Sequence, residues 1–345
     1  MRRRFLIVIL GGAVLLVISV LLSLMFGPYG PLDTSSNVAD PMDYGELFGA
    51  LFGRGTDEHR VVVMDIRLPR ILLAALVGTA LALSGTTMQG VFRNPLAEPF
   101  ILGISSGAAL GAALNLVAGV GGDARYISLP LLAFAGGLLA AFTTYAIARA
   151  AGRPRSDTLL LAGVALNSLL TAALLGVLFF SGEQFRSLFF WILGGFDRGT
   201  WPAVAVIALT AGAGSLFLAR RSKALNLLML GDDQASSLGV DVERQKRDLL
   251  IVSALLASVT VALAGAIGFV GLIIPHLLRL LIGSDNRLVI PAAALFGASF
   301  LVWADLGARS VLETGELPVG IITALCGAPF FLYLLARRRG SIARF

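Results

Sequence analysis

Apolar stretches of about 20 residues follow one another along almost the whole chain, and this pattern limits the possible folds more than any other feature. A helix needs roughly 20 mostly apolar residues to cross a hydrocarbon core of roughly 30 Å. Charged residues make up 14% of the chain, well below the roughly 25% of soluble domains. A soluble fold would therefore expose too much apolar surface. We predict an all-α polytopic membrane protein with about ten transmembrane helices, in which residues 1–345 form a single transmembrane domain.

The short eighth span is separated from the seventh only by Gly268 and Gly271. Arg2 to Arg4, followed by an apolar run, resemble a cleaved signal, but the run is longer than a signal core of roughly 7–15 residues. We therefore expect it to be the first helix. The predicted spans are Phe5–Phe26, Ile71–Val91, Phe100–Gly119, Ile127–Ala150, Thr158–Ser181, Trp201–Ala219, Leu249–Ile267, Phe269–Ile282, Leu288–Leu306 and Leu317–Ala336.

The basic residues indicate how the chain is oriented. With the N-terminus in the cytoplasm, most of the 27 lysine and arginine residues fall in cytoplasmic loops or tails, as the positive-inside rule requires. Both termini are then cytoplasmic. The sequence pI near 10.1 follows from this topology, so we expect no nucleic-acid partner.

A weak internal repeat accompanies the spans. Ala82-Leu83-Ser84-Gly85 recurs as Ala262-Leu263-Ala264-Gly265, and Pro95 matches Pro275 at the same offset. An odd number of spans separates the two copies, which predicts inverted repeats of the kind found in transporters.

Gly103, Gly107 and Gly111 recur every four residues and predict a helix face that a neighbouring helix approaches closely. The same stretch satisfies G-x-S-x-G, the pattern of a serine nucleophile, so an intramembrane hydrolase using Ser105 and His276 is a rival hypothesis. Glycine- and serine-rich membrane helices meet this pattern by chance, which disfavours the rival.

The chain has no nucleotide motor of its own. A phosphate-binding Walker A loop needs Gly-Lys followed by Ser or Thr, and neither Lys223 nor Lys246 follows a glycine. Buried ionisable groups, which proton-coupled transporters use, are nearly absent from the spans, so a secondary transporter is a second disfavoured alternative. His276 has no partner histidine or cysteine at metal-ligand spacing, and we expect no metal or cofactor in this chain. Cys326 is the only cysteine, so no intrachain disulfide can form.

The polar segment 226–248 is the most informative cytoplasmic part. We predict two short helices here, separated at Gly231-Asp232-Asp233, with an aspartate capping the second. Such a segment suits insertion into a groove on a cytoplasmic partner.

Six motifs, in order from about residue 60, resemble the FecCD-type permeases of type II ABC importers, which carry ferric siderophores, haem or cobalamin. They are Arg67-Leu68-Pro69-Arg70, Arg93 to Pro99, Leu102 to Gly107, Leu230 to Gly239, Gly265 to Gly271 with Pro275-His276, and Glu316 to Gly320.

This resemblance implies a homodimer in a bacterial or archaeal plasma membrane, with two cytoplasmic ATPase subunits that hold ATP and Mg and a periplasmic or lipid-anchored binding protein. The substrate would be a bulky metal chelate, an iron-siderophore or haem, with cobalamin as the alternative. The implied residues are Gly231, Asp232, Ala235, Leu238 and Gly239 for ATPase coupling; Arg67, Arg70 and Arg309, exposed at the outer ends of spans, for binding-protein docking; and Met88, Gln89, Asn167 and Ser168 for the translocation path.

Overall fold

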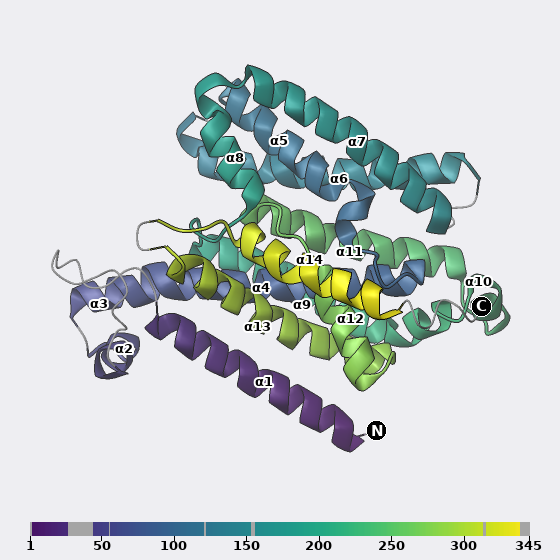
Figure 1. The fold of residues 1–345 in the computed structure, drawn as a ribbon, viewed down its shortest axis with the longest axis horizontal. Helices are drawn as coiled ribbons and strands as arrows, with labels where there is room; N and C mark the ends of the chain where they lie inside the picture. Colours follow the sequence, from purple (N-terminus) through teal and green to yellow (C-terminus); the bar gives the residue numbers. More distant parts are fainter. Residues whose placement is uncertain are drawn as a thin grey trace.

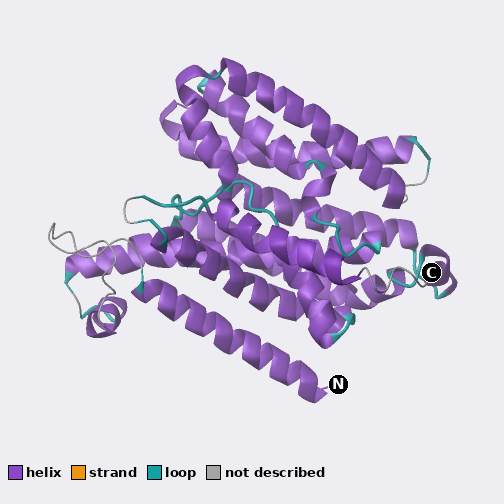
Figure 2. Cartoon of the chain, viewed as in Figure 1, coloured by secondary structure: helices purple, strands orange, loops and turns teal. Residues whose placement is uncertain are grey.

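A computed structural model describes residues 2–26, 44–54, 56–120, 122–152, 156–312 and 315–338. Within these ranges the chain forms helices and no strands (Figure 2), so the predicted all-α class is confirmed. The helices are α1 (Arg2–Met25), α2 (Tyr44–Leu51), α3 (Asp57–Val61), the π-helix η1 (Val62–Arg67), α4 (Leu68–Phe92), η2 (Pro99–Leu102), α5 (Ile104–Ala118), η3 (Gly122–Ala124), α6 (Arg125–Ala150), α7 (Ser156–Phe180), η4 (Gly182–Gln184), α8 (Phe185–Leu193), α9 (Trp201–Leu228), α10 (Asp232–Ser237), α11 (Val242–Ala264), α12 (Val270–Ile282), α13 (Asn286–Ser310) and α14 (Val319–Arg338).

The apolar helices match the predicted spans one for one. Among the described residues, seven helices are long and apolar enough to cross a membrane, and three shorter apolar helices, α5, α12 and α14, account for the remaining predicted spans. The division between α11 and α12 confirms that the seventh and eighth spans are separate helices.

Helix α4 lies at the centre of the larger helix group and packs against α9, α11, α12 and α13 (Figure 1). Glycines permit this close contact. A Cβ at Gly78 would meet the carbonyl oxygen of Gly297 on α13, and one at Gly85 would meet that of Gly271 on α12. Because lipid tails are as apolar as leucine, such close packing of small residues, rather than the hydrophobic effect, holds membrane helices together.

Helices α5 to α8 form a second group that α11 joins to α4 (Figure 1). The predicted glycine face is confirmed at Gly107 and Gly111, whose α-carbons lie against backbone carbonyls of Gly136 and Leu132 on α6. Gly103 differs, because it precedes α5 with a φ of 80° that favours glycine.

The contacts define two ends of the molecule. The indole N–H of Trp201 donates to the Met64 carbonyl, so α9 and α4 start at the same end, which we call the Trp201 end. An ion pair between Arg93 and Asp232 places the other end of α4 beside α10, from which α11 begins. Helices α4 and α11 are therefore antiparallel, as inverted repeats predict.

Several details differ from the sequence predictions. The first of the two short helices expected in 226–248 is the last part of α9, so only α10 is a separate short helix. Gly231 precedes α10 without a side-chain cap, and Asp241 instead caps α11. Helix α8, with nine residues, was not predicted. Part of the acidic first loop, residues 27–43, lies outside the described ranges.

Candidate functional site

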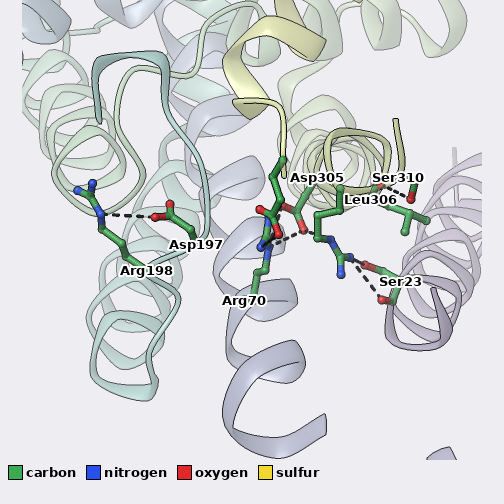
Figure 3. A network of polar contacts seen from close by, with 9 residues as sticks. Ser23, Arg70, Asp197, Arg198, Asp305, Leu306 and Ser310 are labelled. Carbon is green, nitrogen blue, oxygen red and sulfur yellow. Dashed lines mark hydrogen bonds and ion pairs between the residues drawn. The ribbon is translucent and has the colours of Figure 1, made fainter. Parts of the chain in front are cut away.

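A buried network of charges lies at the Trp201 end (Figure 3). Arg70 Nη2 is 2.8 Å from Asp305 Oδ1 and 2.8 Å from Glu316 Oε2, and a second pair of bonds makes both contacts bidentate. Arg309 Nε lies 3.1 Å from the other oxygen of Asp305. The side chains of Arg70, Asp305 and Arg309 are 7%, 1% and 1% exposed. The network thus fastens α4, α13 and the segment before α14 together.

Arg309 of this network and Arg67 at the end of η1 also lie at the C-terminal end of α1. The last carbonyls of a helix have no intrahelical donors and carry a partial negative charge. Arg67 Nη1 donates to the Leu24 carbonyl at 2.6 Å, and Arg309 Nη2 donates to the Ser23 carbonyl at 3.4 Å and to the Ser23 hydroxyl at 2.6 Å. Arg67 and Arg309 therefore act as capping donors for α1.

The expectation that Arg67, Arg70 and Arg309 are exposed is wrong, since their residue exposures are 1%, 6% and 3%. The carboxylates of Asp305 and Glu316 and the free carbonyls of α1 draw these guanidinium groups inward. Their role in docking a binding protein stays a prediction.

The predicted coupling residues lie together at the opposite end. Ala235 is fully buried, whereas Leu238 is 60% exposed beside Gly239, and Gly231 precedes the helix. Lys246 Nζ forms an ion pair with Asp232 Oδ2 at 2.6 Å, and the lysine side chain is only 7% exposed. Asp232 at the start of α10 is therefore held by Lys246, and the apolar side chain of Leu238 is exposed directly after the helix.

A second polar network lies near the C-terminal end of α9, which precedes α10 in the chain. Asn226 on α9 donates to Asp285 at 2.7 Å and accepts a bond from Asn286 at 2.7 Å, and Arg279 on α12 donates to Asn286 at 3.0 Å. Burial alone would raise the pKa of Asp285, but the backbone N–H of Arg287, the Asn226 amide and the Arg287 charge hold it below its ordinary value.

The four predicted path residues do not lie together. Met88 and Gln89 are 0% and 3% exposed, and Gln89 Nε2 donates to the Leu272 carbonyl at 3.1 Å. Both residues are buried in this structure, and Gln89 connects α4 to α12, so their part in the path stays a prediction. Asn167 and Ser168 on α7 instead line an open recess of about 450 Å³.

This recess brings together polar side chains from three elements, with Glu98 directly before η2, Ser105 on α5, and Asn167, Ser168 and Thr171 on α7. Burial raises the pKa of the Glu98 carboxyl, while the backbone N–H of Phe269, which donates to it, acts in the opposite direction. Glu98 was not predicted as a site residue because it lies between two predicted spans, although its position between Pro95 and Pro99 in a family-like motif was a usable signal.

The hydrolase hypothesis finds no geometric support. Among the described residues, no hydrogen bond joins Ser105 to His276, which lies against the ring of Phe331 on α14 at a centroid distance of 6.0 Å. Ser105 faces the recess.

Comparisons with known proteins agree with this architecture. The model of the FecCD transport family matches residues 15–337. The chain is 48% identical to the cobalamin import permease BtuC of Halobacterium salinarum, covering 81% of this chain and 74% of that protein. It is 43% identical to the hemin transport permease HmuU of Yersinia pestis, covering 80% and 83%.

A solved inward-facing ABC transporter described as metal-chelate type superposes with a TM-score of 0.81 at 32% identity, covering 95% of this chain and 98% of that one. Permeases of this family are not enzymes, and ATP is hydrolysed by a separate subunit. The chain therefore belongs to the FecCD transport family and is a permease of the type II ABC importers that carry metal chelates, vitamin B12 or haem.

Proposed function

We propose that two copies of this chain form the translocation unit of an importer in the plasma membrane of a bacterium or archaeon. Each copy binds one cytoplasmic ATPase through α10, both termini are cytoplasmic, and a binding protein delivers the chelate at the Trp201 end. The orientation is supported by the basic residues near α10, which include Arg93, Lys246 and Arg279.

The exposed tip of α10 is the observation that carries this proposal. Leu230 and Leu238 are 55% and 60% exposed on either side of a helix whose base is held by the pair of Lys246 and Asp232. An apolar tip on a rigid support is what a groove on a partner recognises.

Co-purification with the candidate ATPase tests this proposal. Leu238→Arg should abolish the complex, because it places a charge at the centre of an apolar contact. The matched control is Phe52→Arg, since Phe52 is 74% exposed and follows α2 near the opposite end. Equal binding by wild type and Leu238→Arg would refute the role of α10.

Two substrate classes are consistent with the relatives named above. An iron complex, haem or a siderophore, is our first hypothesis and draws support from the hemin permease, while a corrinoid draws support from the cobalamin permease. ATP-driven uptake of each chelate into vesicles containing the complete importer separates the two.

A further inference from the structure

The exposed face of α9 changes from apolar to basic along its length. Leu209, Leu216 and Lys223 recur at a spacing of two helical turns, and Arg220 lies one turn after Leu216, so the four residues share one face of the helix. Leu209 and Leu216 are 75% and 54% exposed, and Arg220 and Lys223 are exposed as well. Because α9 is long and apolar enough to cross a membrane, the exposed leucines lie against lipid. Arg220 and Lys223 continue this lipid-facing stripe.

The length of α9 places these basic residues at a membrane boundary. The helix begins at Trp201, which is 43% exposed and whose indole N–H donates to the Met64 carbonyl. Tryptophan with an apolar body and a satisfied polar tip is typical of the membrane–water interface. At a rise of about 1.5 Å per residue, Arg220 lies roughly 28 Å further along the helix, close to the roughly 30 Å of the hydrocarbon core. Arg220 and Lys223 therefore lie at the level of the lipid headgroups, at the end of the molecule that contains α10.

These positive charges have no acidic counterpart. Helix α9 contains neither aspartate nor glutamate, and within the described part of the chain Arg220, Arg221 and Lys223 form no ion pair. By contrast, Lys246 at the same end pairs with Asp232. Like charges one turn apart on a helix repel each other. The basic turn therefore favours an anion from outside the chain.

Arg221 is held in a position that leaves its donors available. Its guanidinium carbon lies 5.5 Å from the centre of the Phe217 ring. Stacking of this kind uses the flat face of the guanidinium and leaves the N–H groups at its edge for hydrogen bonds. Two guanidinium groups and one ammonium group match a phosphate, which accepts several charge-assisted hydrogen bonds. At this depth in the membrane, the phosphate at hand is that of a phospholipid.

We propose that Arg220, Arg221 and Lys223 form a binding site for the headgroup of an anionic phospholipid, whose acyl chains lie along Leu209 and Leu216. An anionic headgroup neutralises the basic turn, whereas a choline headgroup brings a further cation to it. The site depends on neither the ATPase nor the transported substrate. Failure of the proposed import function is therefore recognised separately, as loss of co-purification with the ATPase.

Titration of the delipidated full-length chain with phosphatidylglycerol, followed by native mass spectrometry, tests the site. Arg220→Gln with Lys223→Gln removes two charges and keeps two long polar side chains. Each basic residue near an anionic membrane surface contributes about fivefold in affinity, so the double variant should bind phosphatidylglycerol about 25-fold more weakly than wild type. An unchanged dissociation constant would overturn the proposal.

Arg244→Gln with Arg247→Gln is the matched control, because it removes the same charge from the exposed start of α11. The apolar part of α11 is 67% buried, against 28% for α9, so it offers less surface to acyl chains. The control should bind phosphatidylglycerol as wild type does. An equal loss in the two double variants would indicate general charge attraction and would refute a site on α9.

Two further ligands identify what the site recognises. Phosphatidylcholine should bind wild type more weakly than phosphatidylglycerol does, and equal affinities would contradict an anionic site. Excess inorganic phosphate should leave phosphatidylglycerol bound, because it lacks the acyl chains that lie along Leu209 and Leu216. Displacement by inorganic phosphate would identify a free anion as the ligand and would overturn the assignment to lipid.

Cysteine labelling tests the depth of the site. In a Cys326→Ser background, Leu216→Cys and Lys223→Cys are compared in lipid nanodiscs with a charged maleimide. Both positions are exposed on the same face of α9, so they differ in depth rather than in burial by the protein. We expect Lys223→Cys to react fast and Leu216→Cys slowly, since a charged reagent does not enter hydrocarbon. Equal rates would show that the membrane boundary does not lie between these residues, and the proposal would fail.

Discussion

Arg70 and Glu316 bind each other through two hydrogen bonds of 2.9 and 2.8 Å although α4 and the segment before α14 are far apart in the sequence. Asp305 completes the contact from α13. The side chain of Glu316 is 25% exposed and that of Asp305 only 1%. Water can therefore replace more of the interaction between Arg70 and Glu316 than of the interaction between Arg70 and Asp305.

This difference predicts a graded loss of stability. Asp305→Ala leaves two guanidinium groups buried without their shared carboxylate, and breaking a buried pair in this way costs roughly 3–5 kcal/mol. Glu316→Ala should cost about 1 kcal/mol, near the upper end for partly exposed pairs. Asp197→Ala is the control, because Asp197 and Arg198 form an exposed pair (Figure 3). Thermal unfolding of the purified variants gives the order, and a larger effect for Glu316→Ala than for Asp305→Ala would contradict the burial argument.

The close contact of α4 with α12 makes a second prediction. In Gly85→Ala the new methyl group meets the backbone of Gly271, which cannot yield as a side chain can, so we expect a loss of about 1–3 kcal/mol. Gly212→Ala on α9 serves as control, since a Cβ there meets nothing within 4 Å and should raise stability by about 0.4–1 kcal/mol. Both changes in stability are measured from the midpoint of unfolding. Equal midpoints for Gly85→Ala and Gly212→Ala would show that α4 and α12 can move apart at little cost.

The spans were predictable from sequence because hydropathy alone specifies a membrane helix. Burial of the docking candidates was not, since Arg67 meets the Leu24 carbonyl 43 positions away and such a contact depends on how α1 docks. Helix α8 escaped prediction because its nine residues are too few to cross a membrane. The recess was half predicted, because Asn167 and Ser168 are polar residues in mid-span, whereas Glu98 joins them only through the fold.

Asp285 makes the stability of the fold depend on pH at the end of the molecule that contains α10. Its pKa is lowered in the folded chain, so the carboxylate stabilises the fold above its unfolded pKa of about 3.9, and this contribution is lost as the pH falls through the lower folded value. Asp285→Asn keeps the acceptor oxygen for Arg287 and Asn226 but has no charge. Wild type should therefore be more stable than the variant at pH 7, and the two should converge towards pH 3. A constant difference in unfolding midpoint over this range would contradict the assignment.

The pair of Lys246 and Asp232 predicts an asymmetry between two single variants. Asp232→Ala leaves the ammonium of Lys246 buried without its carboxylate, whereas Lys246→Met leaves Asp232 with solvent and with Arg93 at 3.7 Å. We expect Asp232→Ala to be the more damaging, although below the roughly 3–5 kcal/mol of a fully buried pair because Asp232 is 36% exposed.

The double variant distinguishes a charge effect from a packing effect. Removing both charges leaves no uncompensated ion, so Asp232→Ala with Lys246→Met should recover most of the stability lost in Asp232→Ala alone. ATPase affinity, measured on the same proteins, should follow the same order, because α10 must be held in place before its apolar tip can enter a groove. If the double variant were as unstable as the sum of the two single variants, the pair would act through packing, and α10 would be positioned chiefly by the buried Ala235.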